Sequence, residues 1–420
     1  MNSVQQLFRT AALTIAWLMV LPCLLVLLSA ILPIVPWLRL YAFNVVPNRT
    51  SWFFLWSIAA LIVGLLSNSH VQTRLASALA ATSAVTVLLT AGVMLHLLYI
   101  AESNGARIDL IRALSLREVD DGAAPDESRI YAHPEGEALW LDIYHPLQTK
   151  TSARSPVMVV VHGGGFLAGS RAFGAANSRW YADHGWTVIS IDYRLSRPDR
   201  PTWNLATNDV QCALAWVAAN AGSLGVDIKR LTLSGGSAGG TLAMAGAYAA
   251  NAKSSDPKCG TPVPHVAAVV AKVPLIDAVG SWQRPGELLG QQRMYLTSYF
   301  GGSPEQYPER YAAADLRRSL GPGNPPTLIL GGANDPLVPP EGAADFTRKA
   351  GAAGYQVRHI LFPYSGHDFN TTFDGVTNQA LLQIIAQFMI DHGAGPTAPG
   401  TRLARVSHRV ARRHSTASHN

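Results

Sequence analysis

A serine lies in a glycine-rich segment of the type that can hold a nucleophile. The segment 233–240 reads LSGGSAGG and places Ser237 between Gly235 and Gly239. A short β-branched run precedes it, and an apolar stretch with helical spacing follows. Glycines at these positions permit the sharp strand-to-helix turn that lifts a serine hydroxyl above a sheet. A tight turn whose serine only caps the helix has the same pattern, but the position between a strand and a helix favours a nucleophile.

A second glycine-rich loop, HGGGF at 162–166, directly follows the predicted strand 156–161. It fits a flexible strand-end loop, and it also fits an anion site, because glycines let backbone N–H groups point at a ligand. In acyl transfer the attacked carbonyl oxygen becomes an oxyanion, which fixed donors stabilise. The expected donors are the N–H groups of Gly164, Gly165 and Ala238. The residues that support the two motifs are His162, Gly163, Gly235 and Gly239.

Two further loops follow predicted strands and carry the other groups that a serine nucleophile needs. His367 titrates near neutral pH and can take the proton of Ser237. Asp335 can fix the tautomer of the imidazole and stabilise the imidazolium. Asp368 and Asp374 are alternatives to Asp335, but neither follows a strand end as directly. The chain order Ser, Asp, His at strand ends predicts a catalytic triad.

The elements that must position these loops form an alternating pattern between about residues 129 and 392. Continuous apolar strands that alternate with helices predict a mostly parallel sheet with helices on both faces. In such sheets ligands bind at the carboxyl ends of the strands, where all four loops fall. The predicted strands are Pro156–Val161, Thr187–Ile191, Arg230–Leu233, Val266–Val273, Pro326–Leu330 and Val357–Phe362. The predicted helices are Leu205–Ala219, Thr241–Ala250, Glu341–Ala353 and Gln379–Ile390.

The segment Asp277–Leu320 interrupts this alternation and is rich in Tyr, Arg and Gly. We expect an insertion that covers the sheet edge as a lid. Its aromatic side chains either line an acyl pocket or pack the lid, and packing is the default for large apolar groups. The aromatic residues in question are Trp282, Tyr295, Tyr299 and Phe300.

The first hundred residues are strongly apolar. Ala11–Val35 and Leu75–Ile100 are each long enough to span a bilayer. Trp52–Leu66 reaches only about 22 Å, so it either spans with local thinning or lies at the interface. Arg9 before the first run also fits a signal peptide, but that run is too long and lacks a convincing cleavage site. We predict an uncleaved, multi-pass membrane region with two to three helices.

The distribution of arginines indicates which side of the membrane the large C-terminal domain faces. Three spans place the large C-terminal domain opposite the N-terminus. The positive-inside rule then favours a cytoplasmic domain by a small margin. The arginines on the side of the domain are Arg39, Arg49, Arg107 and Arg112, and those on the other side are Arg9 and Arg74.

The net charge of +6 does not indicate a nucleic-acid-binding domain. No acidic residue follows Asp391, and the last residues are basic. Without these basic residues of the tail the chain is close to neutral. It therefore lacks the surplus of positive charge that a nucleic-acid-binding domain carries. The tail is expected to be disordered; it either pairs with anionic lipid or is simply solvated. The arginines of the tail are Arg402, Arg405, Arg409, Arg412 and Arg413.

Three cysteines form no CxxC pair, so the sequence supports no zinc site and no disulfide framework. Cys212 and Cys259 can bridge, but free thiols are favoured.

The chain resembles the α/β-hydrolase esterases of the hormone-sensitive-lipase-like group from about Leu139 to Ile390. With its apolar front it is similar to membrane-anchored mycobacterial lipolytic esterases. From composition and hydrophobic pattern we predict a membrane region at 1–105, a connector at 106–128, an α/β-hydrolase domain at 129–395 and a basic tail at 396–420. The resemblance to the family implies no metal and no organic cofactor. The residues that carry it are Leu141–Tyr144 with Pro146, His162–Phe166, Ile191–Leu195, Gly235–Gly239, Asp335–Leu337 and Gly366–Phe369.

One residue departs from the family pattern, because Gly236 stands where many members have Asp. This leaves the triad intact but puts the subfamily in question. In the family Asp192 and Arg194 look structural. The resemblance implies hydrolysis of short- to medium-chain carboxylic esters, and location at a bilayer favours lipid esters as a further substrate. The alternatives are an arylformamidase-like amidase or a deacetylase on the same fold, and a ligand-binding relative without activity. The presence of His367 argues against the last.

Overall fold

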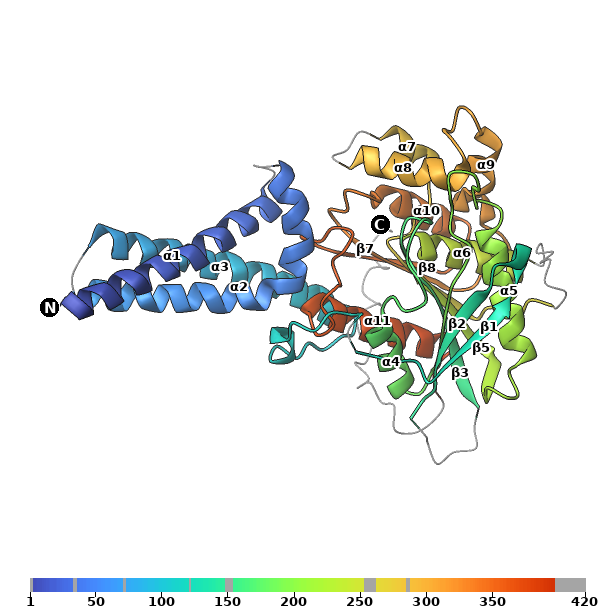
Figure 1. The fold of residues 1–420 in the computed structure, drawn as a ribbon, viewed down its shortest axis with the longest axis horizontal. Coiled ribbons are helices and arrows are strands. Elements are labelled where there is room, and N and C mark those ends of the chain that lie inside the picture. The colour runs from blue at the N-terminus through green and yellow to red at the C-terminus, as the bar shows by residue number, and fades with distance from the viewer. Residues whose placement is uncertain are drawn as a thin grey trace, which may run out of the picture.

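A computed structural model describes residues 3–32, 36–70, 73–120, 122–147, 154–252, 262–284 and 288–396. It has two parts, an elongated helical bundle and an α/β domain (Figure 1). The bundle consists of helices α1 (Ser3–Ile31), α2 (Pro36–His70) and α3 (Arg74–Ser103). The end of the first predicted span, at 33–35, and the basic tail from residue 397 lie outside the described residues.

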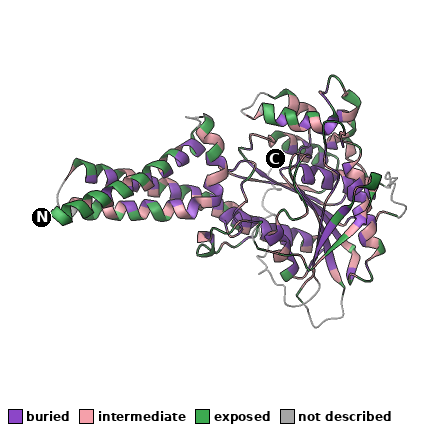
Figure 2. Cartoon of the chain, viewed as in Figure 1, coloured by how far each residue is buried: buried purple, intermediate pink, exposed green. Residues whose placement is uncertain are grey.

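All three helices of the bundle are long and apolar enough to cross a membrane. The short apolar run Trp52–Leu66 is part of the much longer α2, which explains why it appeared too short by itself. Large apolar side chains cover the outside of the bundle, among them Leu18, Leu88 and Leu95, which are 70 %, 72 % and 64 % exposed. Figure 2 shows these exposed faces along the outside of the bundle. A helix surface of this kind is suited to contact with lipid.

Helix α2 connects the two parts. Figure 1 shows it bending between a first section beside the α/β domain and a second section within the bundle. Pro47 lies inside the helix, and an internal proline removes a backbone hydrogen bond and bends the helix axis. Phe43 and Phe53 of α2 belong to the same buried cluster as Phe369 and Phe373 of the domain. The bundle therefore shares an apolar core with the domain.

The described residues of the domain form an eight-stranded sheet in the order β1-β2-β4-β3-β5-β6-β7-β8. Strands β3 to β8 are parallel, whereas β2 pairs antiparallel with both β1 and β4. The six parallel strands are the six predicted from the sequence. The bounds are β1 Glu127–Ala132, β2 Leu139–Tyr144, β3 Ser155–Val161, β4 Thr187–Ile191, β5 Val226–Gly236, β6 Ala268–Lys272, β7 Thr327–Gly332 and β8 Val357–Phe362.

Helices cover both faces of the sheet, as predicted, and this confirms the α/β-hydrolase fold class. One buried cluster joins the sheet to α4 (Ala175–Asp183), α11 (Val376–Asp391) and the bundle. A second cluster joins it to α5 (Ala206–Ala219), α6 (Ala238–Asn251) and α10 (Glu341–Ala352). The remaining helical elements are α7 Ala278–Gln283, α8 Leu289–Phe300, α9 Pro308–Ala313 and the short 3-10 helices Arg112–Leu114, Pro134–Gly136 and Leu316–Ser319.

The expectation of free thiols is wrong for Cys212, which is disulfide-bonded. Cys259 lies outside the described residues. Cys23 in α1 is a free, buried thiol. A bonded Cys212 is the alternative that the sequence left open, because cysteine spacing alone does not decide between free and paired thiols.

Candidate active site

Ser237 sits at a sharp turn between strand and helix. Strand β5 ends at Gly236, and α6 begins at Ala238. Ser237 adopts φ 53° and ψ −123°, a conformation that L-residues rarely occupy and that marks functional turns. Neighbouring backbone leaves no space for side chains, because a Cβ on Gly239 would lie 2.1 Å from the carbonyl oxygen of Val161. Gly235 and Gly239 are thus required by the turn itself.

The loops after β7 and β8 bring two further side chains to this serine. His367 Nε2 lies 2.9 Å from Ser237 Oγ. His367 Nδ1 lies 2.7 Å from Asp335 Oδ2. The other carboxylate oxygen, Asp335 Oδ1, accepts hydrogen bonds from the N–H groups of Leu337 and Val338 at 2.9 and 2.8 Å. The three predicted triad residues therefore form one continuous hydrogen-bonded chain.

The electrostatic surroundings favour a His367 that can gain a proton. Burial alone would lower the pKa of this imidazole, but the charge and hydrogen bond of Asp335 and the charge of Asp368 raise it above its ordinary value. The alternative carboxylates take no part in the chain of hydrogen bonds. Asp368 binds Asn44 through its backbone N–H, and Asp374 binds Gln379 through its carbonyl.

The glycine loop after β3 lies beside Ser237 with free donors. Gly164 and Gly165 have φ angles of 116° and 61°, which glycine adopts without strain. Within the described part of the chain, the N–H groups of Gly164, Gly165 and Ala238 donate to no protein acceptor. His162 supports the loop, because its Nδ1 donates to the carbonyl of Gly163 at 2.7 Å. Burial lowers the pKa of His162, so a neutral ring in this tautomer is favoured.

Comparison with known proteins agrees with this geometry. Residues 141–350, half of the 420 residues, match BD-FAE. The chain belongs to the BD-FAE family. It is 29 % identical to the esterase LipC of Mycobacterium tuberculosis over 60 % of this chain and 62 % of LipC. It is 28 % identical to an ethyl acetate hydrolase of Pseudomonas putida over 56 % of this chain and 72 % of that protein. The alignment thus spans under two thirds of the length of LipC.

A solved structure gives the same picture of the fold. A thermophilic esterase of Thermogutta terrifontis with bound propionate superposes with a TM-score of 0.53 and 25 % identity. The superposition covers 66 % of this chain and 98 % of that one. The resemblance to α/β-hydrolase esterases of the hormone-sensitive-lipase-like group is thereby confirmed.

The insertion of this BD-FAE chain lies over the catalytic edge of the sheet, with α7, α8 and α9 grouped there (Figure 1). Most of its aromatic side chains pack, as expected. Tyr299 stacks on Phe166 with ring centroids 3.8 Å apart, and Phe300 stacks on Tyr311 at 3.9 Å. Tyr295 differs, because it lines the pocket next to the glycine loop. Trp282 is half-buried and lies beneath the guanidinium of Arg293 at 5.2 Å.

Sequence reasoning missed a set of contacts from the bundle to the His367 loop. The N–H of Asp368 donates to Asn44 Oδ1 at 3.2 Å. Asn48 donates to the carbonyl of Asp368 at 2.9 Å and accepts from the N–H of Thr372 at 3.2 Å. Two asparagines before an apolar span were the only signal, and they do not reveal a partner more than three hundred residues away.

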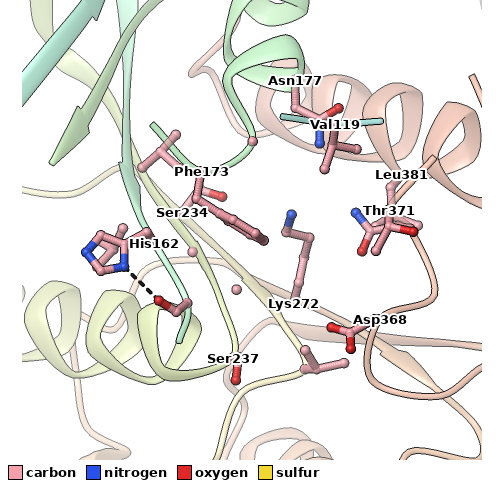
Figure 3. A pocket seen from close by; sticks show the side chains of 18 of the residues that line it. Val119, His162, Phe173, Asn177, Ser234, Ser237, Lys272, Asp368, Thr371 and Leu381 are labelled. Carbon is pink, nitrogen blue, oxygen red and sulfur yellow. Dashed lines mark hydrogen bonds between the residues drawn. The ribbon is translucent and has the colours of Figure 1, made fainter. Parts of the chain in front are cut away.

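The triad and the glycine loop open into a pocket of about 330 Å³. This volume is at the lower end for small-molecule sites. Figure 3 shows Ser237 at one end and Lys272, from the end of β6, reaching into the space beyond it. Sequence reasoning missed Lys272, because a lysine at a strand end usually points into solvent. Among the described residues no cluster of His, Cys, Asp or Glu is suited to a metal ion.

The pair Asp192 and Arg194 has structural contacts. Asp192 binds Arg171 at 2.7 Å, and Arg194 binds the buried Asp209 at 2.7 Å. Tyr131 donates from its hydroxyl to the carbonyl of Asp192 at 2.6 Å. These contacts tie the segment after β4 to Tyr131 of β1, to Arg171 and to α5, and they lie outside the pocket lining.

Proposed function

We propose that this protein is a serine carboxylesterase or lipase that hydrolyses carboxylic esters through Ser237, His367 and Asp335. One observation carries the proposal: the His367 ring bridges Ser237 Oγ at 2.9 Å and Asp335 Oδ2 at 2.7 Å. A hydroxyl that is hydrogen-bonded to an imidazole, which is itself oriented by a carboxylate, is the arrangement that activates a serine nucleophile.

In the first half-reaction Ser237 Oγ attacks the ester carbonyl while His367 Nε2 takes its proton. The Asp335 carboxylate holds the Nδ1–H of the ring and stabilises the imidazolium. The carbonyl oxygen, now negative, lies against the free N–H groups of Gly164, Gly165 and Ala238. His367 then protonates the leaving alcohol. In the second half-reaction His367 activates a water molecule, which releases the acid and restores Ser237.

The relatives support an ester of a short acid. The Pseudomonas putida relative is named an ethyl acetate hydrolase, and the Thermogutta terrifontis structure holds propionate. A pocket of about 330 Å³ suits a short to medium acyl chain. Three helices that can cross a membrane support a domain held at a bilayer, and lipid esters are the substrates concentrated there. Residues 1–105 are the proposed membrane region, and the tail arginines are a proposed contact to anionic lipid.

Two indicators disagree on the side of the membrane that the domain faces. The arginine bias favours the cytoplasm, whereas the disulfide of Cys212 is typical of an oxidising compartment. The disulfide carries more weight, because the bias is small and Arg49 forms an ion pair with Glu118. Labelling of an exposed Ser223→Cys variant by an impermeant maleimide in intact cells tests this. Labelling supports a domain outside the cytoplasm, and protection until lysis supports the cytoplasm.

A fluorophosphonate probe tests the nucleophile in the full-length protein in detergent micelles. We expect the probe to label the wild type on the peptide that contains Ser237, and to label neither Ser237→Ala nor His367→Ala. Ser223→Ala, an exposed serine, is the matched control and should label normally. A folded wild type that resists the probe would instead indicate a ligand-binding relative. Labelling together with turnover of only anilides, formamides or acetylated sugars would indicate the amidase or deacetylase alternatives.

A further inference from the structure

The pocket contains a cation that the proposed mechanism does not use. Lys272 ends β6 next to the nucleophile, and its carbonyl accepts a hydrogen bond from the N–H of Ser237 at 2.8 Å. Its side chain lines the pocket, and Figure 3 shows the ammonium end pointing away from Ser237 towards Asn177 and Thr371. Within the described residues this ammonium has neither a hydrogen bond nor an ion pair.

The polar neighbours of Lys272 are engaged elsewhere. Asn378 donates to Asn177 at 2.9 Å, and Asn370 donates to Asn378 at 3.1 Å. The rest of the wall is largely apolar and screens little charge. The apolar residues that line the pocket include Val119, Met158, Val160, Leu381, Leu382 and Ile385.

Two carboxylates lie in the vicinity. Asp120 acts on Lys272 through its charge, and Asp368 lines the same pocket. Neither forms an ion pair with the lysine, and Asp120 accepts a hydrogen bond from the N–H of Gly174 instead. Burial lowers the pKa of Lys272, and the negative charge of Asp120 offsets only part of this lowering. An unpaired ammonium in such a place is costly, and groups of this kind concentrate where a ligand supplies the missing charge.

We propose that Lys272 binds a carboxylate of the substrate, so that the enzyme prefers esters that carry a second, anionic carboxyl group at short reach from the ester carbonyl. This inference rests on the proposed esterase activity. A carboxylate suits the site because one ammonium matches one negative charge. The small volume of the pocket also limits the acid or the alcohol to a few carbons.

Gly236 keeps the ammonium available. It is the register partner of Lys272 in the parallel pair β5–β6. A Cβ at this position would meet only Lys272 Cε, at 3.5 Å, which is an ordinary contact. A carboxylate side chain at position 236 would therefore fit and would reach the lysine. With glycine there, the charge of Lys272 is left for a substrate.

Two matched ester pairs test the proposal with the full-length protein in micelles. Monoethyl glutarate against ethyl pentanoate places the carboxylate on the acid, and 3-acetoxypropionate against propyl acetate places it on the alcohol. We expect a preference for the charged member of one pair, and that pair identifies which part of the substrate reaches Lys272. Lys272→Met should lower kcat/KM for the preferred charged ester by about 10- to 100-fold, which is the usual effect of losing a charged hydrogen bond. The kcat/KM for the neutral ester of the same pair should stay within about threefold of wild type. Lys229→Met, at an exposed position, is the control.

A second variant pair guards against a fold defect. In Gly236→Asp the new carboxylate should pair with Lys272 and abolish the preference for the charged ester. In Gly236→Asn the new side chain has nearly the same shape but no charge, so the preference should remain. Equal losses on charged and neutral esters, or a wild type that favours the neutral member of both pairs, would overturn the proposal. Failure of the esterase proposal looks different, because then no ester turns over and the fluorophosphonate does not label Ser237.

Discussion

The backbone N–H of Asp368 donates to the side chain of Asn44 at 3.2 Å, which ties the loop of His367 to helix α2 of the bundle. The residue on the other side of the histidine is held in the same way, because the N–H of Gly366 donates to the carbonyl of Phe43 at 2.8 Å. His367 thus lies between two hydrogen bonds to one helix. The bundle is therefore part of the support of the proposed site.

Asn48→Ala should slow catalysis without abolishing binding. The variant removes two hydrogen bonds to the His367 loop, and small displacements of a catalytic group cost up to about 100-fold in rate. We expect kcat to fall by about 10-fold or more while KM changes little, measured with p-nitrophenyl butyrate. Asn204→Ala, an exposed asparagine, should behave as wild type. A rise in KM with kcat unchanged would contradict a role in positioning His367.

Asp368→Asn should shift the pH dependence of the reaction. In the proposed mechanism His367 acts as base in its neutral form, and its pKa is raised above the ordinary value, so activity should fall as pH drops through that raised pKa. Removing the Asp368 charge takes away one cause of the rise and lowers the pKa of His367. The acid limb of kcat/KM should then move to lower pH with the plateau retained. An acid limb that stays in place or moves to higher pH would count against this electrostatic account.

Gly165→Ala should remove most activity while the protein stays folded. Its φ of 61° disfavours alanine, and a Cβ would lie 2.5 Å from the Tyr295 ring. The loop must then move and withdraw an oxyanion donor, whose loss costs about 100- to 1,000-fold in kcat. Gly225→Ala is the control, because Gly225 has a φ of 65° but open space around it. Circular dichroism melts of both variants separate a fold defect from a catalytic one.

Most of the fold and the arrangement of the proposed triad followed from local sequence patterns. Parallel strands bring their carboxyl ends to one edge, so loops at strand ends could be expected to meet before any coordinates were known. The antiparallel strands β1 and β2 were not predicted as strands. β1 is mostly exposed or half-buried, with Tyr131 as its one buried residue, and so it lacks the apolar run that identified the others.

The features that were missed depend on contacts between distant parts of the chain. The local sequence around Asn48 and Lys272 marks neither residue as important. Their significance comes from what lies next to them in space, namely the His367 loop for one and the nucleophile turn for the other. The disulfide of Cys212 is of the same kind. Local pattern therefore predicted which residues come together at the proposed site, but it did not predict the contacts from distant parts of the chain.

The central claim is that Ser237 is the nucleophile of an ester hydrolase. Hydrolysis of p-nitrophenyl esters of increasing acyl length by the full-length protein and by Ser237→Ala tests it most directly. We predict turnover by the wild type with an optimum at short to medium chains, and a loss of at least about 1,000-fold in the variant; in a serine protease, loss of this residue costs about 10⁶. A folded Ser237→Ala protein that keeps the wild-type rate would contradict the account.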